Sequence, residues 1–178
     1  MTLNDILVSA LAQLDRGSDP MTMDAYRKRL TDYANDAQSD LARALRLSRT
    51  ETAHPSGGIV ELSDLSRDCL KIVKVEQLGH AVKFKSTDTG AIALPYNETA
   101  RITYRYEPER LEQPSDVSEL PEHAHGLIVT YVVARERMAG DVSTQRGANV
   151  YLSMYEAAKS RLRPRPGDPA GYEIVNRW

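Results

Sequence analysis

The sequence has one cysteine, one tryptophan and one phenylalanine, and no long apolar run. With Cys69 alone, the chain cannot build a disulfide framework or a cluster of thiolate metal ligands. No stretch approaches the ~20 consecutive apolar residues of a membrane-spanning helix. The N-terminus lacks the basic-then-apolar order of a secretory signal peptide. These absences predict a soluble protein that is made inside a cell and does not bind a membrane.

Charge of one sign is also lacking, because the formal net charge is only −2 over 178 residues. The chain as a whole therefore has no electrostatic attraction to nucleic acid. Charge is uneven locally, since residues 107–122 are acidic and residues 135–165 are basic. Such segments are most often solvated surface. In a ring of subunits, however, they would set an acidic face against a basic neighbour.

Helical spacing of apolar residues is present towards both ends of the chain. Leu3, Ile6, Leu7, Ala10 and Leu11 recur at steps of three and four, which is typical of one face of a helix. We predict helices over 3–14 (capped by Thr2 or Asn4), 23–47 (capped by Thr22), 121–138 and about 142–162.

Between the helices, the spacing changes to the period of two that is typical of strands. The clearest case is 101–106, where Ile102, Tyr104 and Tyr106 share one face and Arg101 and Arg105 the other. Further candidate strands are 59–62, 70–77, 81–85 and 92–94. We predict one small antiparallel sheet of four or five strands.

The predicted fold class is α+β: an antiparallel bundle of about four helices with an inserted small antiparallel β-sheet and an extended C-terminal tail. The expected parts are an N-terminal helical part (1–53), a β-rich insert with an acidic return loop (54–120), a C-terminal helical part (121–162) and a tail (163–178). The helices on either side of the insert need each other to bury their apolar faces.

The sequence shows no recognisable catalytic or metal-binding pattern. His123 and His125 lie two positions apart, which on a helix separates them by about 200° and prevents shared metal ligation. His54, His80 and Cys69 belong to no known nucleophile motif. No phosphate-binding glycine pattern is present. We therefore expect a protein that is not an enzyme and has no catalytic residue, metal or cofactor.

The order of elements resembles the head-to-tail adaptor (connector) proteins of tailed bacteriophages. The resemblance lies in three places: the N-terminal helix pair; the strand Ile102–Tyr106 with its Glu107-Pro108 ending and acidic loop; and Leu120-Pro121-Glu122-His123 before an apolar helix, Gly140-Asp141 and a Tyr-rich last helix. It implies a structural virion protein in the neck between head and tail, made in the host cytoplasm. Such a protein forms a homo-oligomeric ring, commonly of twelve subunits, under the portal protein. The ring extends the DNA channel without sequence-specific binding and carries a downstream neck or tail protein.

The tail is the expected portal-docking segment. It is basic at its start and apolar at its end, as an interaction segment would be. The candidate docking residues are Arg163, Arg165, Tyr172, Ile174, Val175 and Trp178. The alternative at this point is that the tail folds back on its own subunit. Two other functions are also open: a stopper or tail-completion protein of the neck, and a nucleic-acid-binding regulatory domain.

Overall fold

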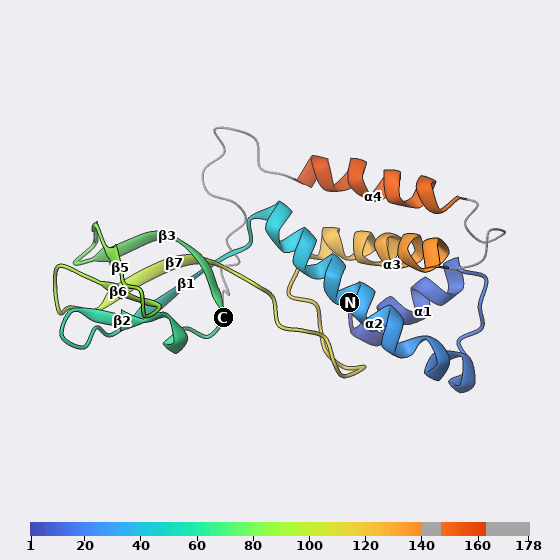
Figure 1. Cartoon of the computed structure of the whole chain (residues 1–178), viewed down its shortest axis with the longest axis horizontal. Helices are drawn as coiled ribbons and strands as arrows, with labels where there is room; N and C mark the ends of the chain where they lie inside the picture. Colours follow the sequence, from blue (N-terminus) through green and yellow to red (C-terminus); the bar gives the residue numbers. More distant parts are fainter. Residues whose placement is uncertain (140–146, 163–178) are drawn as a thin grey trace. The chain divides into compact units, whose positions relative to one another are not determined.

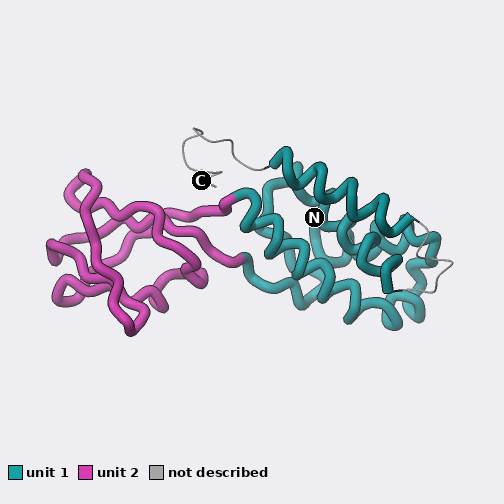
Figure 2. The backbone as a smooth tube through the Cα atoms, turned by 45° about the horizontal axis from the view of Figure 1, so that its top comes forward, with its two compact units in different colours: residues 1–45, 108–163 teal, residues 46–107, 164–178 magenta. Residues whose placement is uncertain are grey.

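The structure is a computed structural model that describes residues 1–139 and 147–162. Within these residues the chain is a mixed α+β protein with four α-helices and two small antiparallel sheets (Figure 1). The chain divides into two compact units, coloured separately in Figure 2. We call residues 1–45 with the described residues of 108–162 the helical unit, and residues 46–107 the β unit.

The first two helices begin at side-chain caps. α1 (Leu3–Gln13) begins after Thr2, whose hydroxyl accepts the Asp5 N–H while the Asp5 carboxylate accepts the Thr2 N–H. This reciprocal pair is a capping box, so the predicted Thr2 cap is confirmed. α2 (Pro20–Leu45) begins three residues before the prediction, and the Thr22 cap is wrong. Asp19 accepts the N–H groups of Met21 and Thr22, and Pro20 fits the first helical turn.

The helical unit is organised around α3 (His125–Ala139), which follows a short 3-10 turn, η2 (Glu122–Ala124). α3 packs against α1, α2 and α4 (Ala148–Leu162), as Figure 1 shows. Its side chains Ile128, Val129, Val132 and Val133 are buried, and α3 packs against both α1 and α2. Burying an aliphatic side chain of this size contributes ~1.5–3 kcal/mol, so these four side chains stabilise the helical unit substantially. The predicted break at 140–141 and the first residues predicted for the last helix lie outside the described residues.

The β unit contains two sheets instead of the one that we predicted. The larger sheet has the order β1-β7-β3-β4, with β1 (Ser48–Ala53), β7 (Ala100–Tyr106), β3 (Cys69–Gln77) and β4 (His80–Ala81). The smaller sheet has the order β2-β6-β5, with β2 (Ile59–Glu61), β6 (Ala91–Ala93) and β5 (Lys85–Ser86). A short 3-10 turn, η1 (Leu62–Asp64), follows β2. All pairings are antiparallel.

Two strand predictions were wrong. Residues 48–53 were expected to belong to the N-terminal helical part, after the helix ending at 47, but they form β1, which pairs with β7 from Ser48↔Arg105 to Ala53↔Ala100. As a result the β unit begins at residue 46 instead of about 54. Of the strand expected over 81–85, only the two end residues lie in strands: Ala81 in β4 and Lys85 in β5. The chain changes sheet between them, and for this reason the strand does not continue.

Candidate interaction surfaces

The predicted docking residues all fall outside the part of the chain that the structure describes. Arg163, Arg165, Tyr172, Ile174, Val175 and Trp178 follow α4, which ends at Leu162. The surfaces that can be built from coordinates are therefore α4 itself, the segment before α3, and the faces of the β unit.

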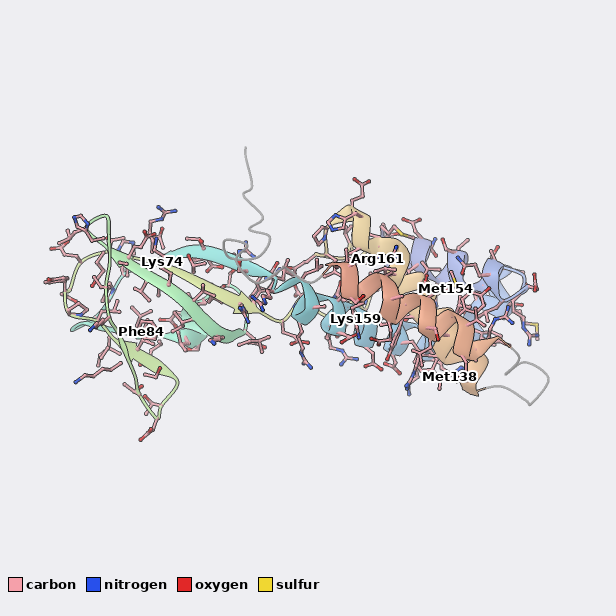
Figure 3. The ribbon with its side chains drawn as sticks, turned by 90° about the horizontal axis from the view of Figure 1, so that it is seen from above. Lys74, Phe84, Met138, Met154, Lys159 and Arg161 are labelled. Carbon is pink, nitrogen blue, oxygen red and sulfur yellow. The ribbon has the colours of Figure 1, made fainter. Side chains whose placement is uncertain are left out.

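The outer side of α4 carries exposed apolar side chains. Val150 is 60% and Met154 is 58% exposed, and Ala157 and Arg161 continue the same stripe at helical spacing. We call these four residues the α4 stripe. Figure 3 looks onto this side of α4 and labels Met154 and Arg161. Contiguous exposed apolar patches, unlike single exposed apolar side chains, mark protein interfaces.

The inner side of α4 is held by a buried polar cluster. The hydroxyl of Tyr155, which is fully buried, donates to Asp40 Oδ2 of α2 over 2.6 Å. Lys159 is only 7% exposed, and its ammonium donates to the same oxygen at 2.8 Å and to Glu156 at 2.7 Å. The Tyr155 ring also contacts the Tyr131 ring of α3 in a tilted arrangement, with the ring centroids 4.9 Å apart. We call Asp40, Tyr155, Glu156 and Lys159 the α4 lock.

The pKa values in the α4 lock follow from this geometry. Burial raises the pKa of Tyr155, and its bond to the Asp40 carboxylate raises it further. For Lys159, burial lowers the pKa, but the hydrogen bonds to Asp40 and Glu156 outweigh it and the net pKa is raised. Tyr155 therefore stays neutral and Lys159 charged at neutral pH, which fixes both hydrogen bonds and the orientation of the α4 stripe.

The return segment, residues 108–120, is clamped to α2 by two buried amide side chains. Asn35 donates to the Leu111 carbonyl at 3.0 Å and accepts the Leu111 N–H at 2.8 Å. Gln38 donates to the Glu109 carbonyl at 2.8 Å and accepts the Ser118 hydroxyl at 2.7 Å. The predicted acidic loop is thus a fixed part of the helical unit, not a solvated excursion.

Several acids of the return segment serve its own turns. Asp116 accepts the N–H groups of Glu112 and Gln113, and these bonds lower the pKa of its carboxyl group. Glu119 accepts the N–H of Glu109 at 3.3 Å. Asp116 and Glu119 therefore have a local structural role.

Three of the basic residues between 135 and 165 are also used within the helical unit. Arg135 lies over the rings of Tyr33 and Tyr131, at 5.4 and 5.9 Å from their centroids. Arg137 lies 5.2 Å from the Tyr151 centroid and donates to the Gln13 carbonyl. Lys159 belongs to the α4 lock. Such cation–π pairs contribute ~0.5–1 kcal/mol each at exposed sites. Arg161, in contrast, is exposed on the α4 stripe.

The larger sheet of the β unit has one apolar and one polar face. Ile102 and Tyr104 of β7 are fully buried, and the Tyr104 hydroxyl donates to Glu51 at 2.7 Å. On the other face, β7 directs Arg101, Thr103 and Arg105 outward, as the alternation predicted. The register adds Lys71 opposite Arg105, Lys74 opposite Thr103 and Glu76 opposite Arg101. The sequence did not indicate this grouping, because two register shifts in β3 interrupt its alternation.

A hollow of about 420 Å³ lies in the β unit beside β1 and β2. Its lining includes Glu51, His54, Glu61 and Asp64. Glu51 already accepts hydrogen bonds from Ser66 and Tyr104; burial works against its charge, but these bonds and Arg49 lower its pKa overall. In residues 1–139 and 147–162, no group of three or more His, Cys, Asp or Glu side chains is placed to hold a metal ion.

The structure places His123 and His125 in two different elements. His123 lies in η2, and His125 opens α3, buried, with Nε2 2.8 Å from the Leu120 carbonyl and Nδ1 3.1 Å from the Met1 amino group. Burial, followed by the positive amino group, lowers the pKa of His125. A neutral ring donates through Nε2 to Leu120 and accepts at Nδ1, so His125 joins the N-terminus to the return segment.

None of the helices in the described residues is long and apolar enough to cross a membrane. No protein-family model matches the sequence, and no curated protein matches it significantly.

Proposed function

We propose that this protein is a head-to-tail adaptor of a tailed bacteriophage, a structural virion protein without enzymatic activity. In this proposal its four helices form an antiparallel bundle that carries the β unit as an insert and residues 163–178 as an extended tail. Copies form a ring, of about twelve subunits in the adaptor family, that seats on the portal protein. The ring extends the DNA channel and receives the next neck or tail protein.

The observation that carries the proposal is the exposed α4 stripe, which leads directly into the tail. Val150 and Met154 keep more than half of their surface exposed although the helix is fixed on its other side by the α4 lock. A rigid helix with an exposed apolar side is suited to bind another protein, because little order is lost when it docks. The tail follows at Leu162, so contacts to a neighbouring copy and contacts to a portal would be adjacent in the chain.

The first experiment tests the tail. The full chain is mixed with its cognate portal ring and imaged by electron microscopy for a ring-on-ring complex. Removal of residues 164–178, or the pair Y172A/W178A, is expected to abolish portal binding while the helical circular dichroism stays unchanged. Normal portal binding by the shortened chain would contradict the role given to the tail.

The second experiment tests the α4 stripe. Met154→Asp places a charge on the exposed stripe and is expected to reduce the yield of complete rings on the portal at least tenfold. Met21→Asp is the matched control, because Met21 is an exposed methionine at the start of α2, 85% exposed. Equal ring yields from both variants would show that the stripe is not an interface.

A further inference from the structure

We propose that the polar face of the larger sheet binds the phosphate backbone of double-stranded nucleic acid without reading its bases. The residues are Lys71 and Lys74 of β3 with Arg101 and Arg105 of β7, which we call the basic sheet face. It lies within the β unit and is independent of the tail and of the α4 stripe.

The register of β3 on β7 brings these four side chains together. Directly paired residues of antiparallel strands point to the same side of a sheet. Lys71 pairs with Arg105, Lys74 with Thr103, and Glu76 with Arg101. The residues between them, Ile72 opposite Tyr104 and Val75 opposite Ile102, point to the buried side. Lys74 alternates regularly with Glu76, and the register shift between Ile72 and Lys74 brings Lys71, three residues earlier, to the same polar face; a second shift lies between Cys69 and Lys71.

Among the paired residues of β3 and β7, this face carries more positive than negative charge. Lys71 and Arg105 are like charges directly opposite each other, an arrangement that destabilises a sheet. The β3–β7 register places one acid, Glu76, on this face. Its carboxylate pairs with Lys74, which lowers the pKa of Glu76, and the positive charge of Arg101 lowers that pKa further. Four basic side chains against one acidic side chain leave three positive charges. An anionic partner would remove the repulsion between Lys71 and Arg105.

Hydroxyl groups extend the same face onto β1. Thr50 pairs with Thr103 and Thr52 with Arg101, and the Thr50 and Thr103 hydroxyl oxygens are 2.9 Å apart. Threonine hydroxyls and arginine or lysine side chains are the usual protein groups that contact phosphate oxygens. Arg101 and Arg105 are four residues apart, ~13 Å along the strand, which is close to the ~12 Å width of a major groove.

The absence of aromatic side chains on this part of the sheet favours a duplex over a single strand. Single-stranded nucleic acid is bound by stacking its bases on aromatic rings. The tyrosines of β7, Tyr104 and Tyr106, are on the opposite, buried face. A flat face of charges and hydroxyls can contact phosphates but cannot enter a groove, so we infer binding that is independent of base sequence. That this face lines a DNA channel rests on the proposed function, whereas duplex binding itself does not.

The test is fluorescence anisotropy of the full chain with two unrelated 30-base-pair duplexes between 25 and 200 mM NaCl. We expect dissociation constants in the weak range of non-specific complexes, ~10⁻⁴–10⁻⁶ M, and less than a threefold difference between the two sequences. Three neutralised phosphates predict a slope of about −3 for log K against log salt concentration. The variant K71Q/R101Q/R105Q is expected to bind at least tenfold more weakly at 50 mM NaCl, with a slope near zero.

Two matched variants separate the face from overall charge and from folding. R16Q/K28Q/K85Q removes three exposed positive charges outside the larger sheet and should bind like the parent protein. K71R/R101K/R105K keeps the charges of the face and should also bind normally, because phosphate contacts of this kind require charge more than shape. Equal losses in R16Q/K28Q/K85Q and K71Q/R101Q/R105Q would overturn the proposal.

Three further results would overturn the proposal. They are no duplex binding at 25 mM NaCl, a preference of more than tenfold for one sequence, and binding to phosphatidylglycerol vesicles in place of the duplex. None of them would affect the portal experiments, which depend on the tail and the α4 stripe. Failure of the portal experiments would, in turn, leave the duplex measurement interpretable.

Discussion

The α4 lock gives a direct prediction for the stability of the helical unit. Tyr155→Phe removes the hydroxyl that donates to Asp40 over 2.6 Å and changes little else in the packing of the ring on Tyr131. A hydrogen bond to a charged group contributes about 1.5–3 kcal/mol. The Asp40 side chain is 42% exposed and keeps Lys159 as a partner. We therefore expect the lower part of this range, a loss of about 1.5–2 kcal/mol.

A double-mutant cycle isolates the pair. Asp40→Ala leaves the buried Tyr155 hydroxyl without this acceptor and Lys159 with only Glu156, so its cost should be larger, about 2–4 kcal/mol. The double variant should recover about 1–2 kcal/mol relative to the sum of the single variants, because the Tyr155–Asp40 bond can be lost only once.

The assay is urea denaturation followed by circular dichroism at 222 nm. The α-helices of the described residues all belong to the helical unit, so this signal reports mainly on that unit. Tyr151→Phe is the matched control one turn earlier in α4, where the ring keeps its contact with Arg137, and its cost should stay below about 0.5 kcal/mol. A coupling energy under about 0.5 kcal/mol, or equal losses for Tyr155→Phe and Tyr151→Phe, would refute the reasoning.

Three other predictions concern buried polar groups. Asn35→Ala removes both hydrogen bonds to Leu111 and should cost about 2–3 kcal/mol, with faster hydrogen exchange at the Leu111 amide; slow exchange there would contradict the clamp. Folding lowers the pKa of His125, so as the pH falls the unfolded chain binds a proton before the folded protein does. The neutral His125 therefore contributes to the stability of the fold above about pH 6.5, and this contribution falls as the pH drops below that value. Thermal midpoints at pH 7.5 and 5 should differ less in His125→Gln than in the parent protein. Burial and the bond to Glu51 raise the pKa of Tyr104 to about 12. The neutral Tyr104 therefore contributes fully to the free energy of unfolding below about pH 10, and this contribution is lost as the pH rises to about 12. In denaturation curves recorded between about pH 9 and 12, Tyr104→Phe should show a smaller dependence of stability on pH than the parent protein.

Sequence periodicity predicted the elements whose two faces differ clearly. The buried stripe of α1, from Leu3 to Leu11, and the alternation of Ile102, Tyr104 and Tyr106 in β7 both appear as expected. β1 was missed because Ser48–Ala53 has no apolar alternation, and its pairing with β7 leaves no mark in its own sequence. Its identity depends on a partner some fifty positions away, which a local pattern does not contain.

The interaction surfaces were less predictable than the elements. Charge counts indicated an acidic and a basic segment, but Asp116, Arg135 and Lys159 are largely engaged within the helical unit. The sequence did not indicate the basic sheet face, because its residues come from two strands that are distant in the chain. In addition, the register shift in β3 hides that Lys71 and Lys74, three residues apart, share one face. Only the strand pairing places them beside Arg101 and Arg105.

The pairing of Ser48 with Arg105 places the two ends of the β unit side by side. Cα atoms of paired antiparallel residues are ~4.5–5.5 Å apart, a gap that a turn of a few residues can close. The sixty or so residues between them thus behave as a cassette: the polypeptide leaves and re-enters the helical unit at neighbouring points. A change in the length of the segment between Ser48 and Arg105 would therefore leave the points at which the chain departs from and returns to the helical unit in place.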